Sequence, residues 1–350
     1  MGTMRAVVEE SVPGLARGLR DPDAHVRIEA AERLLSRAPI GTGSPIRRAI
    51  LTPRETRDAL AVLIDVARSD ECADVRALAV NALGAFRCDD PRAVEVLLAA
   101  LRDPSDMVRS EAAGALGEVP ADASAVLSGL TTALSDPVAE VRLAAAVALE
   151  ARTADLEPYC EVLLSTLDDP EPLVGEHVAH AIELIWRGRA EEPDRLAGKL
   201  APIPRTAAAV RLASALGVID TASLVESVEH EASRIAAIHA LAERGSASLE
   251  EGLRRFAGID SDALDTWLLR AEPTPWRAGS ERAWADALAS IASSGPIALR
   301  CTAIAALPTV ERSLRMAVLL ERLALENDPD VRETADAARA ELNEMLGLSR

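Results

Sequence analysis

A phrase that recurs every 33 residues constrains this chain more than any other feature of its sequence. The phrase reads Asp-Pro, three further residues, Val-Arg, and then an alanine-rich stretch that ends in leucine. Full copies begin at Asp103 and Asp136, and a third begins at Asp169 with Gly175 in place of the arginine. A phrase repeated in one register predicts a repeated structural unit. A further copy begins upstream at Asp21, and a partial one contains Asp74-Val75-Arg76, so the anchoring valines of five repeats are Val26, Val75, Val108, Val141 and Val174.

Each repeat predicts two helices joined by a turn. A leucine stands seven residues before four of the five anchoring valines and closes an apolar stretch with helical spacing. Proline cannot continue the first helix, but it is tolerated in the first turn of the second, where the aspartate can cap backbone N–H groups. Such a pair cannot bury its apolar face alone, so neighbouring pairs must stack. The sequence therefore predicts an all-α solenoid of about eight to nine helical hairpins, wound as a right-handed superhelix.

The repeats divide the chain into a regular and an irregular part. Regular copies occupy residues 1–190, where the first valine spacing is 49 rather than 33 and predicts a 16-residue insertion near residues 38–54. Weaker copies follow in residues 191–350, and in the last of them Arg339 replaces the leucine, as suits a terminal cap. We expect one elongated domain whose second half continues the solenoid. The proline-containing segment Glu192–Pro204 could bend the array.

The phrase around Val108-Arg109 and Val141-Arg142 closely resembles the HEAT repeat, in the short form that also occurs in phycobilin lyases. The resemblance implies that the second helices line a concave groove, with the residues two, three and six positions after each valine directed into it. An apolar stretch there suits an amphipathic helix or an extended segment of a partner, and ordinary packing between repeats is the alternative. The candidate partner-binding residues chosen in this way are Leu78, Asn81, Glu111, Leu143, Val147, His177 and His180.

An arginine follows the anchoring valine in most copies. Because these arginines recur at one position beside recurring aspartates, we predict that they pair with acids of neighbouring repeats as a structural ladder rather than form a ligand-binding stripe. Gly175 interrupts the series and could mark a change of curvature or a functional opening. The arginines of the predicted ladder are Arg27, Arg76, Arg109, Arg142, Arg234, Arg300 and Arg332.

The net charge narrows the choice of partners. The chain carries 38 basic and 56 acidic residues, for a net charge of −18 spread over both halves. Such a field repels phosphate backbones and anionic lipids, so we expect neither nucleic acid nor membrane as a partner, but a protein with a basic or amphipathic segment. The absence of an apolar run long enough for a span or a leader favours a cytoplasmic location.

The basic residues comprise 37 arginines and a single lysine, Lys199. A halophilic host and a GC-rich genome both fit this bias. Melting in dilute and in molar potassium chloride separates the two explanations, because a halophilic protein gains stability from salt.

The sequence contains no glycine-rich phosphate loop, nucleophile elbow or HExxH motif, so it predicts a non-catalytic protein without cofactor or metal. His177 and His180, with Glu176, Glu183 or His239 as a conceivable third ligand, are more typical of a polar helix face than of a metal site. The alternative class is a lyase or isomerase related to phycobilin lyases, with His177, His180 and Glu183 as working residues.

Two other HEAT-like enzyme families fit poorly. Deoxyhypusine hydroxylases carry His-Glu pairs directly after the Val-Arg, and this chain has none at those positions. HEAT-like DNA glycosylases use a basic cleft with aromatic residues, whereas residues 1–180 hold only Phe86 and Tyr159 as aromatics. Nothing in the groove positions therefore predicts either activity.

Three of the four tryptophans, Trp267, Trp276 and Trp284, lie in one irregular stretch. Such large side chains either fill gaps left by irregular repeats or anchor a partner, because tryptophan is frequent at interface hot spots. Trp276 is the residue of this stretch that we name as a candidate partner contact.

Overall fold

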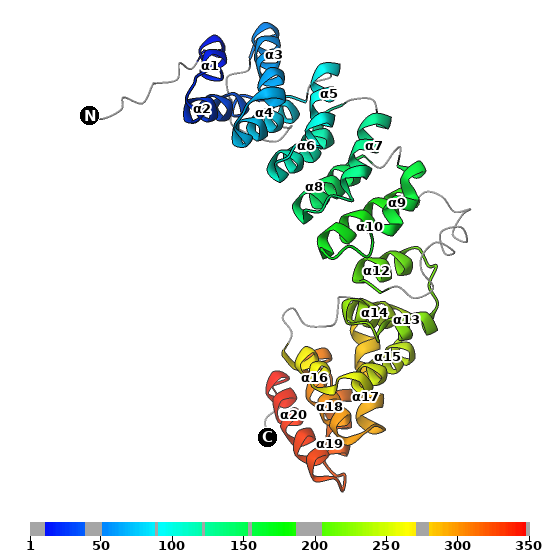
Figure 1. The fold of residues 1–350 in the computed structure, drawn as a ribbon. Coiled ribbons are helices and arrows are strands. Elements are labelled where there is room, and N and C mark those ends of the chain that lie inside the picture. Colours follow the sequence, from blue (N-terminus) through cyan, green and yellow to red (C-terminus); the bar gives the residue numbers. More distant parts are fainter. Residues whose placement is uncertain are drawn as a thin grey trace. The chain divides into compact units, whose positions relative to one another are not determined.

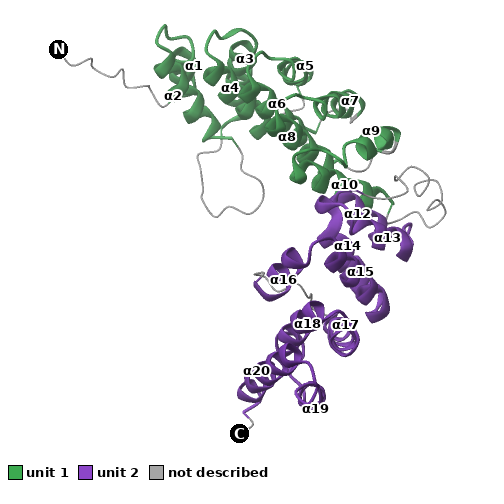
Figure 2. Cartoon of the chain, turned by 60° about the horizontal axis from the view of Figure 1, so that its bottom comes forward, with its two compact units in different colours: residues 1–189 green, residues 190–350 purple. Residues whose placement is uncertain are grey.

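Every regular element in the described residues of the computed structural model is helical. The chain divides into two compact units, residues 1–189 and residues 190–350 (Figure 2). The structure describes residues 11–38, 51–87, 90–120, 123–152, 156–186, 205–270 and 280–347.

The described residues of unit 1 form five helix pairs in chain order. In each pair the two helices pack against each other, and a short 3-10 turn, Glu157–Tyr159, precedes the fifth. The second helices also pack side by side, so they form one continuous row (Figure 1). The pairs are α1 (Val12–Gly18) with α2 (Ala24–Leu35), α3 (Pro53–Ser69) with α4 (Ala73–Ala85), α5 (Pro91–Ala100) with α6 (Asp106–Glu118), α7 (Ala123–Ala133) with α8 (Ala139–Glu150), and α9 (Cys160–Ser165) with α10 (Pro172–Trp186). We call α2, α4, α6, α8 and α10 the second-helix row.

Small side chains set the spacing within this row. The repeated Ala-Ala and leucine of the phrase are fully buried in α6 and α8. A Cβ atom on Gly84 would lie 2.6 Å from the Cα of Ala115, and one on Gly117 would lie 3.0 Å from the Cβ of Ala148. Glycine at these two positions therefore allows α4, α6 and α8 to approach closely.

The turn within each pair differs from the sequence-based prediction in the position of its proline. Asp103 and Asp136 cap as expected, because their carboxylates accept hydrogen bonds from the N–H groups of Ser105 and Val138, each at 2.9 Å. The prolines that follow them lie in the turn rather than in the first turn of the helix, since α6 and α8 begin at residues 106 and 139. The aspartate caps the turn two residues ahead, which leaves the proline outside the helix. Only in α20 does the proline of the phrase, Pro329, occupy the first helical position.

Unit 2 begins in the described residues with α12 (Ala207–Ala215) and continues with four helix pairs. Together with unit 1, the described residues hold nine pairs plus α12, which agrees with the predicted solenoid. The predicted insertion falls mostly on residues 39–50, and both Glu192–Pro204 and Trp276 lie outside the described residues. The pairs are α13 (Thr221–Ser227) with α14 (Glu231–Arg244), α15 (Ser246–Ile259) with α16 (Ser261–Arg270), α17 (Glu281–Ser293) with α18 (Ile297–Val310), and α19 (Leu314–Leu323) with α20 (Pro329–Met345).

An aromatic cluster fills the irregular part of unit 2. Trp284 is fully buried, and the ring of Trp267 lies 5.9 Å from it, 6.1 Å from Phe256 and 6.0 Å from His239. The interpretation that tryptophans fill gaps between irregular repeats is therefore confirmed for Trp284, whereas Trp267 is only half-buried.

Candidate interaction surface

The arginines that follow the anchoring valines form the predicted ladder in unit 1. Each uses Nε and Nη2 to bond both carboxylate oxygens of an aspartate in the next repeat, at 2.7–3.0 Å. Each Nη1 also donates to the carbonyl oxygen of the aspartate that opens its own repeat. The prediction of a structural ladder is confirmed, and these arginines are not available to a ligand. The pairs are Arg27–Asp70, Arg76–Asp103, Arg109–Asp136 and Arg142–Asp169.

The electrostatics of the ladder follow from this geometry. The hydrogen bonds from Arg109 hold the pKa of Asp136 below its usual value, although burial opposes the shift. At Asp169 burial alone would raise the pKa, but the hydrogen bonds from Arg142 and from the N–H of Glu171 outweigh it and lower the pKa. Both carboxylates are therefore ionised at neutral pH.

The ladder changes in unit 2. Arg300 pairs with Glu326 at 2.5 Å, in place of an aspartate. The guanidinium of Arg234 lies 4.9 Å from the centre of the Phe256 ring, and its Nε donates to the carbonyl of Val228 at 2.9 Å. Arg332 donates to the carbonyl of Glu326 at 3.4 Å. Among the described residues of unit 2, the predicted pairing with an acid is therefore found for Arg300, whereas an aromatic ring and backbone carbonyls take the place of the acid at Arg234 and Arg332.

A groove of about 940 Å³ crosses α2, α4 and α6 of the second-helix row. Three of the candidate residues, Leu78, Asn81 and Glu111, line it together. The Nδ2 of Asn81 donates to Glu111 at 2.6 Å, so these two side chains link neighbouring repeats across the groove. The rest of the lining is mainly apolar or small, with carboxylates at the edges: Glu32, Leu35, Ser36, Ala38, Gly84, Ala85, Arg87, Gly114, Ala115 and Glu118.

The charged side chains of the groove are mostly acidic. Glu32 lies on α2, whereas Glu111 and Glu118 lie on α6. The one cation of the lining, Arg87, is bonded to Glu118 at 2.8 Å. The groove therefore combines an apolar lining, which we call its floor, with a net negative set of charged side chains, which we call its rim.

Leu143 and Val147 are not among the residues that line this groove. Both lie on α8, one helix further along the row, where Leu143 is half-buried and Val147 is 45% exposed. The apolar stretch predicted from Leu78 to Val147 is thus divided, and the groove itself ends at α6.

His177 and His180 meet at a residue that the sequence analysis did not select. Their Nδ1 atoms lie 2.5 Å and 2.7 Å from the two carboxylate oxygens of Glu150, at the end of α8. Burial would raise the pKa of Glu150, but the hydrogen bonds from both imidazoles outweigh it and lower the pKa. The sequence does distinguish Glu150, because it occupies the repeat position that is Gly84 and Gly117 in the two preceding repeats. Within the described residues, no group of three or more histidine, cysteine, aspartate or glutamate side chains is arranged to hold a metal ion.

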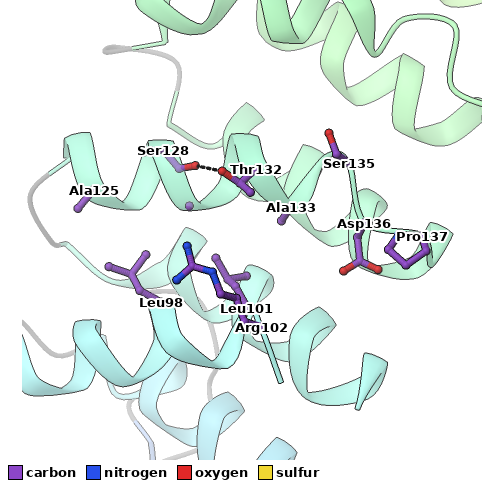
Figure 3. A pocket seen from close by; sticks show the side chains of 11 residues that line it. Leu98, Leu101, Arg102, Ala125, Ser128, Thr132, Ala133, Ser135, Asp136 and Pro137 are labelled. Carbon is purple, nitrogen blue, oxygen red and sulfur yellow. Dashed lines mark hydrogen bonds between the residues drawn. The ribbon is translucent and has the colours of Figure 1, made fainter. Parts of the chain in front are cut away.

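A second concavity of about 550 Å³ lies between the first helices α5 and α7. Leu98 of α5 and the two residues that follow this helix, Leu101 and Arg102, line it together with Ser128 and Thr132 of α7 (Figure 3). Its far end includes Asp136, which is already bonded to Arg109 in the ladder. None of the candidate partner-binding residues lines this second concavity.

Comparison with known proteins identifies the repeat. Residues 60–150 match the family model for HEAT repeats. This segment is an array of HEAT repeats. It extends from within α3 to the end of α8 and so contains the ladder arginines Arg76, Arg109 and Arg142. No curated protein matches the sequence.

Solved structures of low sequence identity share the α-solenoid fold. Kap121p is 15% identical with a TM-score of 0.50, and the match covers 95% of this chain and 45% of that one. The karyopherin Kap121p bound to the extreme C-terminus of the protein phosphatase Cdc14p is 15% identical with a TM-score of 0.52, over 95% and 46% of the two chains. This chain thus spans less than half the length of those proteins. At this identity the likeness shows an α-solenoid fold.

None of the described helices is both long and apolar enough to cross a membrane.

Proposed function

We propose that this protein is a non-catalytic scaffold or adaptor that holds a protein partner along the second-helix row of its HEAT repeats. The groove across α2, α4 and α6 is the observation that carries the proposal. It joins side chains from three successive repeats into one surface, and such extended surfaces are the usual binding sites of repeat proteins.

The chemistry of the groove defines the partner. Its apolar floor, which includes Leu35 and Leu78, suits the apolar face of a bound segment. Its carboxylates at Glu32, Glu111 and Glu118 attract positive charge, and the net charge of −18 favours encounter with a basic chain. The partner segment is therefore basic or amphipathic, and neither nucleic acid nor an anionic membrane fits the surface.

The comparison with solenoids supports the general mode of binding. One structure of similar fold was solved with the extreme C-terminus of Cdc14p bound to Kap121p. A solenoid of this type can thus hold a polypeptide terminus. The basic or amphipathic character of the partner and the cytoplasmic location are predictions from the sequence, and a halophilic host and a GC-rich genome are its two explanations of the arginine bias.

Affinity purification from the native host, in buffer matched to its intracellular salt, tests the proposal. The Glu32→Arg/Glu111→Arg double variant reverses two charges of the groove. The control is Glu95→Arg, which reverses one exposed charge on α5, outside the groove. We expect mass spectrometry to find a stoichiometric protein with the wild type and with the control, but not with the double variant.

Two outcomes would count against the scaffold. Equal retention of the partner by the double variant would remove the groove from the interaction. A bound metal or chromophore in place of a polypeptide would instead favour the lyase or isomerase alternative and direct attention to His177, His180 and Glu183.

A further inference from the structure

Gly114 occupies an unusual place in the groove. It lies in the interior of α6, where glycine is disfavoured because it gives up more conformational freedom than any other residue. A Cβ atom on Gly114 would meet nothing within 4 Å. Packing within the chain therefore gives no reason for glycine at this position.

The other glycines of the row show the contrast. Gly84 and Gly117 are required by the close approach of neighbouring helices, since a Cβ on either would contact an alanine of the next helix at 2.6 Å or 3.0 Å. Gly114 is exposed and lines the groove. Unlike Gly84 and Gly117, Gly114 therefore leaves open space on the surface of the groove.

The same repeat position carries a side chain in the other four repeats of unit 1. Six residues after the anchoring valine stand Glu32, Asn81, Val147 and His180. In α6 alone this side chain is absent, so the row has a gap between the Asn81–Glu111 pair and Glu118. Leu78 and Ala115 contribute apolar groups to the lining of the same groove.

We propose that the partner segment seats one large apolar side chain over Gly114, with basic side chains on both flanks that reach Glu111, Glu118 and Glu32. This inference rests on the proposed scaffold function and specifies the partner at its binding site. A large apolar side chain gains most from this position because it covers the exposed backbone and the apolar floor together. The carboxylates at the rim select arginine or lysine beside it.

Two fluorescein-labelled heptapeptides test the proposal on the full chain by fluorescence anisotropy. Both carry two arginines at each end separated from the centre by alanine, and the central residue is tryptophan in one and alanine in the other. We expect the wild type to bind the tryptophan peptide about tenfold or more tightly than the alanine peptide, as the burial of one large side chain implies.

Gly114→Leu fills the gap and is the decisive variant. It should bring the affinity for the tryptophan peptide down to that for the alanine peptide, and leave the alanine peptide within about twofold of wild type. The matched control is Gly258→Leu on α15, because Gly258 is also an exposed helical glycine with nothing within 4 Å of a Cβ. Gly258→Leu should change neither affinity, and circular dichroism of both variants should match that of the wild type.

The outcomes separate this inference from the scaffold proposal. Equal affinity of the wild type for the two peptides overturns the role of Gly114 but leaves the acidic groove as a binding surface. An advantage of the tryptophan peptide that survives in Gly114→Leu likewise overturns it. If neither peptide binds, and the groove double variant still retains its partner from the native host, both proposals fail.

Discussion

The ladder bond between Arg109 and Asp136 should be a major source of stability in unit 1. Arg109 donates Nε and Nη2 to the carboxylate at 2.7 Å and 3.0 Å, and its Nη1 donates to the carbonyl of Asp103 at 3.0 Å. The Arg109→Met change keeps the aliphatic stem but removes these three bonds and the longer bond of 3.3 Å from Nη1 to the carbonyl of Pro104. It leaves the Asp136 carboxylate, only 9% exposed, with the N–H of Val138 as its remaining donor among these contacts. Removal of one partner from a buried ion pair costs about 3–5 kcal/mol of stability. Because the Asp136 carboxylate keeps slight contact with solvent, we expect Arg109→Met to lower the free energy of unfolding by about 3 kcal/mol.

The assay must resolve local stability, because a repeat array can unfold in parts. We would follow urea unfolding by circular dichroism together with native-state hydrogen exchange of α6 and α8. A double-mutant cycle with Asp136→Asn should give a coupling free energy above about 1.5 kcal/mol. The control is Arg87→Met, which breaks the exposed Arg87–Glu118 pair, where Arg87 is 55% exposed, and should cost less than about 1 kcal/mol. A coupling below about 0.5 kcal/mol, or equal losses for the two arginine variants, would refute the reasoning.

Three further predictions follow from the same contacts. Arg109 lowers the pKa of Asp136 in the folded state, so the stability that this carboxylate contributes is present above its unfolded pKa of about 3.8 and is lost as the pH falls through the lower folded value. Asp136→Asn should therefore reduce the loss of stability that urea melts measure between pH 6 and pH 3. An unchanged loss would contradict this prediction. Gly84→Ala should destabilise the folded protein by about 1–3 kcal/mol, because the added Cβ would lie 2.6 Å from the backbone of α6. Gly114→Ala should stabilise it by about 0.5–1 kcal/mol, because the added Cβ meets nothing and alanine favours the helix. Melting temperatures of the two variants that shift in the same direction would be inconsistent with this packing. Trp284→Ala should cost about 3–5 kcal/mol, and hydrogen exchange should locate the loss in α15, α17 and α18; protection retained there would show that the tryptophan is not a core residue.

The register of the repeat made the ladder predictable. In three pairs the arginine and its aspartate are 27 residues apart, whereas Arg27 and Asp70 are 43 apart. The excess equals the 16-residue insertion inferred from the valine spacing. Once one phrase is known to place arginine and aspartate at fixed positions of adjacent repeats, every copy in register makes the same contact, and an insertion between α2 and α3 leaves it intact.

The contacts of the second-helix row were harder to predict because they depend on the offset between neighbouring helices. Asn81 reaches Glu111, and Glu150 reaches both His177 and His180, so each contact links one helix to the next. From the sequence, Glu176, Glu183 or His239 was the conceivable third ligand beside the two histidines. Helical periodicity selects neighbours within one helix. It does not show which residue of the preceding helix lies opposite, and that depends on how closely the small residues allow the helices to pack.

The positions that hold the fold together and those that face the groove are separate, and this separation has a consequence for function. The arginine after each valine and the glycine or alanine that sets helix spacing, such as Gly84 and Ala115, are occupied by internal contacts. The residues three and six positions after the valine vary from acidic to apolar to imidazole along the row, as Glu111, Val147 and His180 illustrate, without disturbing the ladder. A change at these groove positions can therefore alter which partner binds while the repeats still stack. The specificity of this scaffold should follow the side chains of the second-helix row, and a missing side chain at Gly114 is as much a part of that specificity as a charge.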